Sequence, residues 1–288
     1  MSAQRVPGRD EEVLVKVGVS AVDIAGARKN VESEIPEWDF DKVRKDARTA
    51  WNNYLSKIDI TTSDKEDKAI FYTALYHTGI SPNLFTDADG RYLGMDLEVH
   101  QGDTLNPIYT VFSLWDTFRA LHPLMTIIDP DLNNHFINSL IKKHQEGGIY
   151  PMWDLASNYT GTMIGYHAVP VIVDAYFKGI RNYDVEKAYQ AMKTSAMQDN
   201  FGVKELKQYG YIPYDVYNKS VSTALEYCYD DWCIAQMAKD LGKIDDYNYF
   251  MRRSSGYRTY FDKEYKLMNG FSSQGSFRRP FDPFFSSY

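Results

Sequence analysis

The sequence contains few cysteines. Only Cys228 and Cys233 occur in its 288 residues, five positions apart in a segment with helical spacing. Residues five apart on a helix point to different faces, so a disulfide between the two is geometrically disfavoured. We therefore predict two free, buried cysteines, which say little about the cellular compartment.

The sequence also lacks the features of nucleic-acid-binding and membrane-spanning proteins. Its formal net charge is −7 and it has no run of Lys or Arg, which argues against a nucleic-acid surface. No apolar run approaches the ~18 residues needed to span a bilayer. The first residues, MSAQRVPGRDEE, include no apolar stretch, so no signal peptide is visible.

Several catalytic signatures are absent as well. The sequence has no P-loop, no GxGxxG, no GxSxG and no Cys/His spacing typical of zinc sites. Phosphoryl transfer, nucleotide-dependent redox chemistry and serine hydrolysis therefore lack support.

Aromatic residues, in contrast, are abundant. The chain has 23 Tyr, 15 Phe and 5 Trp, or 15% of the sequence. Such a composition fits a pocket lined with aromatic faces for a polar, ring-shaped ligand. A large aromatic core is the commoner explanation, so a binding site needs local evidence.

The pattern of apolar residues predicts one strand followed by many helices. Alternating valines predict the strand over Glu12–Ser20. Helical spacing predicts helices at about 38–58, 63–77, 108–128, 131–146, 161–178, 184–197, 221–241 and 245–261. Asp39 or Asp41 is placed to cap the first of these helices, and Ser63 with Glu66 forms a capping box for the second. The segment 79–107, with a DADG turn, reads as a long functional loop.

This succession of helices predicts an all-α chain. Loops that alternate short and long favour hairpins of helices, as in an α/α toroid, where the longer loops gather at one end and build a site. A helical bundle or a solenoid is the alternative. The sequence shows no fixed-length repeat, which weakens the solenoid.

The first candidate site lies in Tyr109–Pro123, where Trp115, Asp116 and Arg119 interrupt an apolar helical stripe. A tryptophan face and a carboxylate suit a sugar, because the ring packs on C–H groups and the carboxylate accepts hydrogen bonds from hydroxyls. The alternative is an internal ion pair between Asp116 and Arg119, three residues apart on one helix, with Trp115 in the core.

A second cluster lies in Gly147–Pro170, where a loop carries Trp153, Asp154 and Asn158. Such loop residues readily face a ligand. The alternative is that Trp153 fills space in the core and that Asp154 or Asn158 forms a local turn. His167, nearby, fits a buried, singly hydrogen-bonded histidine.

A third cluster lies on the predicted helix 221–241. Glu226 and Asp230 are four residues apart and share a helix face. Two carboxylates in one pocket raise the pKa of one of them, which is the raw material of general acid catalysis. The alternative is that both carboxylates anchor loops by accepting backbone N–H bonds.

Four segments, in order, resemble the catalytic module of bacterial glycoside hydrolase family 92. They are YTVFSLWDTFRALHPL, GGIYPMWDLASNYTGTMIGYHAVPVIVDAYFKG, SVSTALEYCYDDWCIAQMAKDLGK and FDPFFSSY. The resemblance implies a calcium-dependent, inverting exo-α-mannosidase acting on mannose of N-glycans or mannans, in the periplasm or secreted. It also implies a β-sandwich, a helical linker and an (α/α)6 barrel. Residues 1–34 would be the end of the sandwich and the linker, and residues 35–288 the helical linker and the first part of the barrel.

The family pattern continues beyond FDPFFSSY with segments that carry the proposed acid, base and calcium ligands, and this chain contains none of them. The resemblance thus places the catalytic pair and the Ca²⁺ ligands beyond residue 288, with Glu226 and Asp230 as fallback catalytic candidates and no metal ligand in this chain. It carries over Trp115, Asp116, Arg119 and Trp153 as substrate-binding residues.

The chain therefore reads as a truncated, inactive piece of an α-mannosidase, with α-1,2-linked mannose as the expected substrate, because an inverting glycosidase needs both carboxyl groups. The alternatives are another α/α-toroid glycosidase and a non-catalytic carbohydrate-binding protein.

Overall fold

The computed structural model describes residues 13–103 and 105–284. About half of these residues are helical. The helices are α1 (Ile24–Glu34), α2 (Phe40–Leu55), α3 (Lys65–Thr78), α4 (Leu114–Thr117), α5 (Leu121–Ile128), α6 (Pro130–Gly147), α7 (Ala168–Phe177), α8 (Val185–Met197), α9 (Val203–Tyr209), α10 (Ser220–Asp240), α11 (Ile244–Ser254) and the 3₁₀ helix η1 (Ser255–Tyr260).

Short antiparallel strands connect these helices. They are β1 (Asn83–Leu84), β2 (Arg91–Leu93), β3 (Val99–Gln101), β4 (Tyr109–Thr110), β5 (Phe112–Ser113), β6 (Trp153–Leu155), β7 (Asn158–Tyr159), β8 (Phe261–Asp262) and β9 (Leu267–Met268). They pair as β1–β4, β2–β3, β5–β6–β7 and β8–β9. The prediction of an all-α chain is therefore too simple, and the chain is mostly helical.

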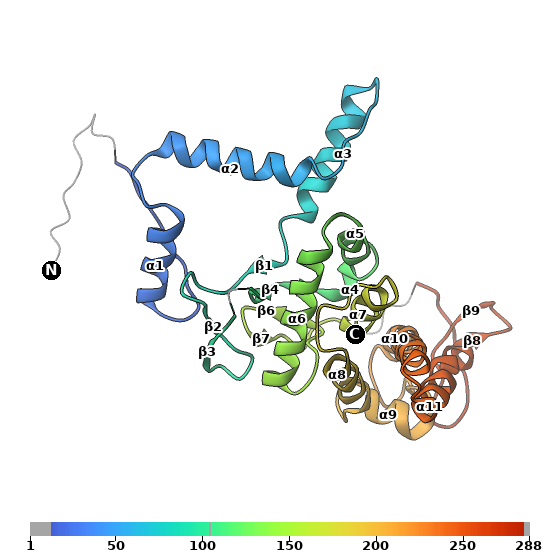
Figure 1. The fold of residues 1–288 in the computed structure, drawn as a ribbon. Coiled ribbons are helices and arrows are strands. Elements are labelled where there is room, and N and C mark those ends of the chain that lie inside the picture. Colours follow the sequence, from blue (N-terminus) through green and yellow to red (C-terminus); the bar gives the residue numbers. More distant parts are fainter. Residues whose placement is uncertain (1–12, 104, 285–288) are drawn as a thin grey trace.

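The helices α1, α2 and α3 form an arm, whereas the elements from α5 to α11 gather into a body (Figure 1). The arm has almost no core of its own, since α2 has no buried residue and α3 buries only Leu75. The two helices meet where the rings of Trp51 and Tyr76 lie 4.4 Å apart. This aromatic contact and a hydrogen bond of 2.8 Å between the hydroxyls of Tyr54 and Thr78 therefore join α2 and α3.

The caps of the arm helices follow the sequence closely. Asp39 caps α2 as predicted, because its carboxylate accepts a hydrogen bond from the backbone N–H of Lys42 at 2.9 Å. The cap of α3 is Asp64, whose carboxylate accepts from the N–H of Glu66 at 2.7 Å. The capping box predicted at Ser63 is therefore wrong by one residue.

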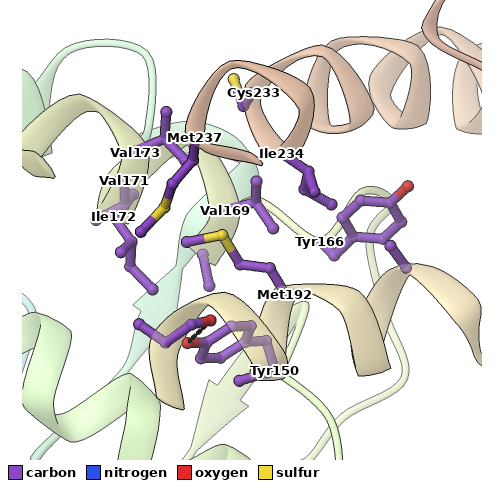
Figure 2. Close-up of a cluster of buried hydrophobic side chains, with 14 of the residues drawn as sticks. Tyr150, Tyr166, Val169, Val171, Ile172, Val173, Met192, Cys233, Ile234 and Met237 are labelled. Atoms are coloured by element: carbon purple, nitrogen blue, oxygen red, sulfur yellow. Dashed lines mark hydrogen bonds between the residues drawn. The ribbon is translucent and has the colours of Figure 1, made fainter. Parts of the chain in front are cut away.

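The core of the body is built around α7. Eight of its ten residues are buried, as expected of a helix that is packed on every side. Figure 2 shows Val169 and Ile172 of α7 meeting Met192 of α8 and Met237 of α10. Each fully buried aliphatic side chain of this kind contributes about 1.5 to 3 kcal/mol of stability. The position of α7 therefore fixes the helices that carry the candidate site.

The predicted strand over Glu12–Ser20 is wrong for residues 13–20, the part that the structure describes. The segment is extended, but it pairs with no other segment in the described residues, and Val13, Val15, Val17 and Val19 are exposed. A strand exists only where its backbone groups bond to a neighbour. Residues 13–20 therefore form no strand with the described part of the chain.

The helix predicted over 108–128 is also wrong in its first part. Val111 has a φ of +65°, a left-handed conformation that interrupts any right-handed helix. Phe112 and Ser113 instead form β5 and pair with Asp154 and Trp153 of β6. Helical structure begins only with α4 and, after a break, α5.

The helix predicted to begin near Gly161 begins at Ala168. Three residues before it have positive φ, with +63° at Gly161, +70° at Met163 and +82° at Gly165. These conformations exclude an α-helix and turn the chain into the start of α7.

Both cysteines are free and buried, as predicted.

The long segment 79–107 is more ordered than a plain loop. Its predicted DADG turn is present, with the N–H of Gly90 donating to the carbonyl of Asp87 at 2.8 Å. The carboxylate of Asp87 accepts hydrogen bonds from Ser20 at 2.6 Å and Asn30 at 2.8 Å. The turn therefore attaches α1 to the β2–β3 hairpin.

Candidate functional site

Ser113 joins two of the predicted sugar-binding residues. Antiparallel pairing of β5 with β6 places Trp153 opposite Ser113. The indole Nε1 of Trp153 donates to the Ser113 hydroxyl at 2.7 Å, and that hydroxyl donates to the carboxylate of Asp116 at 2.6 Å. The structure thus brings Trp153 and the exposed Asp116 together. Nothing in the sequence points to Ser113, because its role depends on a strand pairing between distant segments.

Trp115 lies beside Asp116 on α4 and is partly buried. Its indole Nε1 is enclosed and has no hydrogen-bond partner in the part of the chain that the structure describes. Buried donors are nearly always paired in folded proteins. Trp115 therefore retains an unused donor next to an exposed carboxylate.

Arg119 does not pair with Asp116, so the internal ion pair considered from the sequence is not formed. Its guanidinium lies 3.0 Å from Glu226 Oε1 on α10, and its side chain remains 54% exposed. The second oxygen of Glu226 lies 3.3 Å from Nε2 of His167. The guanidinium of Arg119 also lies over the ring of Phe118, 4.7 Å from its centroid.

Asp230 is completely buried and faces the turn before α7. Its carboxylate lies 2.8 Å from Nδ1 of His167 and accepts the backbone N–H of Tyr166 at 2.8 Å. Burial raises the pKa of Asp230 above its usual value, and the neighbouring His167 opposes that shift. Asp230 therefore acts as an anchor of the turn, and its enclosure removes it from contact with a ligand.

The next residue, Asp231, anchors the same turn from a second side. Its carboxylate accepts the hydroxyl of Tyr166 at 2.6 Å and two guanidinium bonds from Arg253 at 2.5 Å. Two consecutive carboxylates of α10 thus hold two consecutive residues before α7. Charge-assisted hydrogen bonds from α10 therefore hold this turn in place.

A buried ion pair supports β6 next to Trp153. Lys143 of α6 lies 3.1 Å from Asp154, and both side chains are buried. Thr110 donates to the other oxygen of Asp154 at 2.8 Å. Burial lowers the pKa of Lys143, and the charge of Asp154 opposes that shift. Asp154, predicted to be a loop residue, is therefore a structural support of the site.

The two cavities described in the body lie apart from this cluster. The larger, of about 1010 Å³, lies between the start of α10 and the segment 267–283, and the smaller, of about 510 Å³, lies between α8 and α11. Neither is lined by Trp115, Asp116, Arg119 or Trp153. The candidate site is therefore defined by its side-chain contacts, and neither of these two cavities belongs to it.

The residues present do not fit a calcium site. Within 13–103 and 105–284, no group of three or more His, Cys, Asp or Glu side chains is arranged to hold a metal ion. Calcium in proteins takes six to eight oxygen ligands.

In the same described ranges, no helix is both long and apolar enough to cross a membrane.

Comparison with solved structures gives close matches in fold. A family GH92 α-mannosidase from Bacteroides thetaiotaomicron, also solved in complex with mannoimidazole, superposes with a TM-score of 0.87 at 42% identity, over 92% of this chain and 35% of that chain. An inverting mannosidase of the same family and organism gives a TM-score of 0.87 at 32% identity, over 93% of this chain and 37% of that chain.

Sequence comparison gives the same answer. An uncharacterized secreted glycosidase from Arthroderma benhamiae is 29% identical over 271 residues, which is 86% of this chain and 30% of that protein. The chain thus spans about a third of the length of these relatives. The model of the glycosyl hydrolase family 92 catalytic domain matches residues 26–287. The chain therefore belongs to glycosyl hydrolase family 92.

Proposed function

We propose that this chain forms the sugar-facing part of an inverting exo-α-mannosidase. In this proposal, Trp115 and Trp153 offer aromatic faces to a terminal mannose, and Asp116 accepts hydrogen bonds from its hydroxyls. The hydroxyl of Ser113, bonded to both Trp153 and Asp116, carries the proposal because it holds an aromatic face and an exposed carboxylate in fixed relative positions. Such preorganisation is what a binding site requires.

Arg119 has a supporting role in this site. Its pairing with Glu226 neutralises part of its charge but leaves its side chain 54% exposed. The guanidinium carries donors that suit the hydroxyls of a sugar. Glu226, on α10, supports Arg119 through this ion pair. The mannoimidazole complex of the similar Bacteroides enzyme supports a mannose-like ligand for the family.

The catalytic pair belongs to the parts of the enzyme outside this chain. Inversion needs one carboxyl group to protonate the leaving oxygen and a second, about 6.5 to 9.5 Å away, to activate water. Among the described residues, Asp230 is enclosed, and Glu226 is held between Arg119 and His167. Neither is free to fill one of these roles. We therefore assign to this chain sugar binding without turnover.

The wider proposal follows the family. The body is the first part of an (α/α)6 toroid that follows a β-sandwich. The substrate is α-1,2-linked mannose of N-glycans or mannans, and the whole enzyme acts in the periplasm or is secreted. In this proposal, a calcium ion of the whole enzyme would take its ligands outside the residues described here.

A titration followed by saturation-transfer NMR tests this function. We expect methyl α-mannoside to bind the chain, and methyl α-galactoside to bind more weakly. Asp116→Asn should weaken mannoside binding about 10- to 100-fold, because one charge-assisted hydrogen bond contributes about 1.5 to 3 kcal/mol. The matched control is Asp46→Asn, which changes an exposed aspartate on α2, away from the site (Figure 1).

Equal binding by Asp116→Asn and the unmodified chain would overturn this assignment of the site. The same samples, given 4-nitrophenyl α-mannoside with calcium, should release no mannose. Release that a chelator abolishes would show that the acid and base lie within the chain. Glu226 and Asp230 would then be the first residues to replace.

A further inference from the structure

Arg119 is one of four side chains that contact one another in a closed ring. Its guanidinium binds Glu226 at 3.0 Å, and Glu226 lies 3.3 Å from His167. The imidazole of His167 stacks on Phe118 with centroids 4.3 Å apart and an angle of 21° between the rings. Phe118 in turn lies beneath the guanidinium of Arg119 at 4.7 Å. Two adjacent residues after α4 are thus attached to opposite ends of one Glu–His pair.

His167 is the buried member of this ring, and its orientation is fixed by another residue. The imidazole is 1% exposed, and its Nδ1 lies 2.8 Å from Oδ1 of Asp230. The second oxygen of Asp230 accepts the backbone N–H of Tyr166. The carboxylate therefore sets both the position of the backbone and the plane of the ring, and Nε2 is left facing Glu226.

The contact between His167 and Glu226 connects the buried imidazole to Arg119. Nε2 of His167 is enclosed and lies 3.3 Å from Oε2 of Glu226, although it has no partner with hydrogen-bond geometry in the described chain. The other oxygen of Glu226 lies 3.0 Å from the guanidinium of Arg119. A fixed imidazole therefore limits where the Glu226 carboxylate can lie, and with it the guanidinium of Arg119.

We propose that His167 is a positioning residue of the sugar site, which fixes Glu226 from the core side and thereby holds the Arg119 guanidinium ready to donate to a sugar hydroxyl. The proposal rests on the function proposed above, since it gives Arg119 a ligand. His167 itself touches no ligand, because it is buried beneath Glu226 and Phe118. Without the ring, Arg119 would be a long, mobile side chain that loses entropy on binding.

Two replacements of His167 separate its two contacts. The amide nitrogen of an asparagine occupies about the place of Nδ1, and that of a glutamine about the place of Nε2. His167→Asn should therefore keep the contact with Asp230 and lose the one with Glu226, whereas His167→Gln should keep a donor toward Glu226. We expect mannoside affinity to fall about tenfold in His167→Asn, equivalent to about 1.4 kcal/mol, and to be largely restored in His167→Gln.

The order of the Arg119 side chain gives a readout that needs no ligand. Its Nε–H signal in ¹⁵N NMR, assigned by its loss in Arg119→Lys, should show a rigid side chain in the unmodified protein and in His167→Gln. In His167→Asn it should show a mobile one. His77→Asn, a change at an exposed histidine of α3, should leave both the affinity and this signal unchanged.

The outcomes distinguish the two proposals. If the unmodified chain binds no mannoside, the proposed function fails, and the Arg119 signal still decides the positioning role. If the chain binds mannoside but Arg119 is as rigid in His167→Asn as in the unmodified protein, the positioning role is overturned. If the His167 variants do not fold, Glu226→Leu removes the side chain through which His167 reaches Arg119. An Arg119 signal as rigid there as in the unmodified protein overturns the positioning role equally.

Discussion

His122 offers a direct test of the packing between α5 and α6. Its side chain is 1% exposed and lies beside the rings of Phe112 and Phe136, with centroid distances of 6.4 and 5.7 Å. Neither of its ring nitrogens has a hydrogen-bond partner in the described residues. Burial lowers the pKa of His122 to about 4, from ~6.5 in an unfolded chain. The cationic form is thus excluded from the folded protein at neutral pH.

The sign of the pH effect follows from this shift. Between the two pKa values the unfolded chain binds a proton that the folded chain does not, so acid favours unfolding. The contribution of neutral His122 is fully present above pH ~6.5 and is lost as the pH falls through the folded value of about 4. A pKa difference of about 2.5 between the folded and unfolded chain corresponds to about 3 kcal/mol of stability. Between pH 7 and pH 4, the free energy of unfolding should fall in both proteins. We expect it to fall by about 3 kcal/mol less in His122→Leu than in the unmodified protein.

Urea denaturation followed by tryptophan fluorescence at both pH values measures this difference. His77→Leu, which replaces an exposed histidine of α3, controls for the loss of an imidazole as such. If His122→Leu and the unmodified protein lose the same free energy of unfolding over this range, the burial argument is refuted.

Two further predictions concern the supports of the site. Asp154→Asn leaves Lys143 buried without a counter-charge and should lower the free energy of unfolding by about 3 to 5 kcal/mol; urea titration checks this, and a loss below about 1 kcal/mol would contradict it. Gly165→Ala and Gly179→Ala both place a Cβ at a φ of +82°, but only the first meets a neighbour, Nε2 of His167, at 2.2 Å. We expect Gly179→Ala to cost about 1 to 2 kcal/mol and Gly165→Ala clearly more in thermal denaturation; equal losses would show that His167 moves aside freely.

The helices of the body were predictable from the sequence where their signals are local. α6 begins with Pro130 after the capping Asp129, and α8 follows the capping Asp184. Each of these signals acts within one turn of the helix it starts. The predicted bounds of these helices therefore differ from the observed ones by only one residue, and those of α10 are similarly close.

The errors lie where distant contacts override local preference. Val111 and Met163 take left-handed conformations that their side chains disfavour. The first stands between β4 and β5, where pairing of β5 with β6 fixes the backbone, and the second precedes the turn that Asp230 anchors. Neither contact can be read from the surrounding residues. A helical pattern of apolar residues was therefore mistaken for a helix at both places.

The residue types of the candidate site are visible in the sequence, but the contacts between them are not. Trp115, Asp116 and Trp153 stand out because aromatic and acidic side chains interrupt apolar patterns. Ser113 and Phe118 carry no such signal, since a serine and a phenylalanine are unremarkable in sequence. Their roles arise from tertiary contacts with Trp153 and His167.

Pairing of β5 with β6 ties the assembly of the site to the folding of the whole body. Ser113 and Trp153 are 40 positions apart, so their hydrogen bond closes a long loop, and the chain entropy lost in closing it is recovered only after α5 and α6 have packed. Contacts of this sequence separation form later than local helical ones. A peptide that contains only Trp115 and Asp116 should therefore show none of the site, and hydrogen exchange at β5 should report the opening of the core.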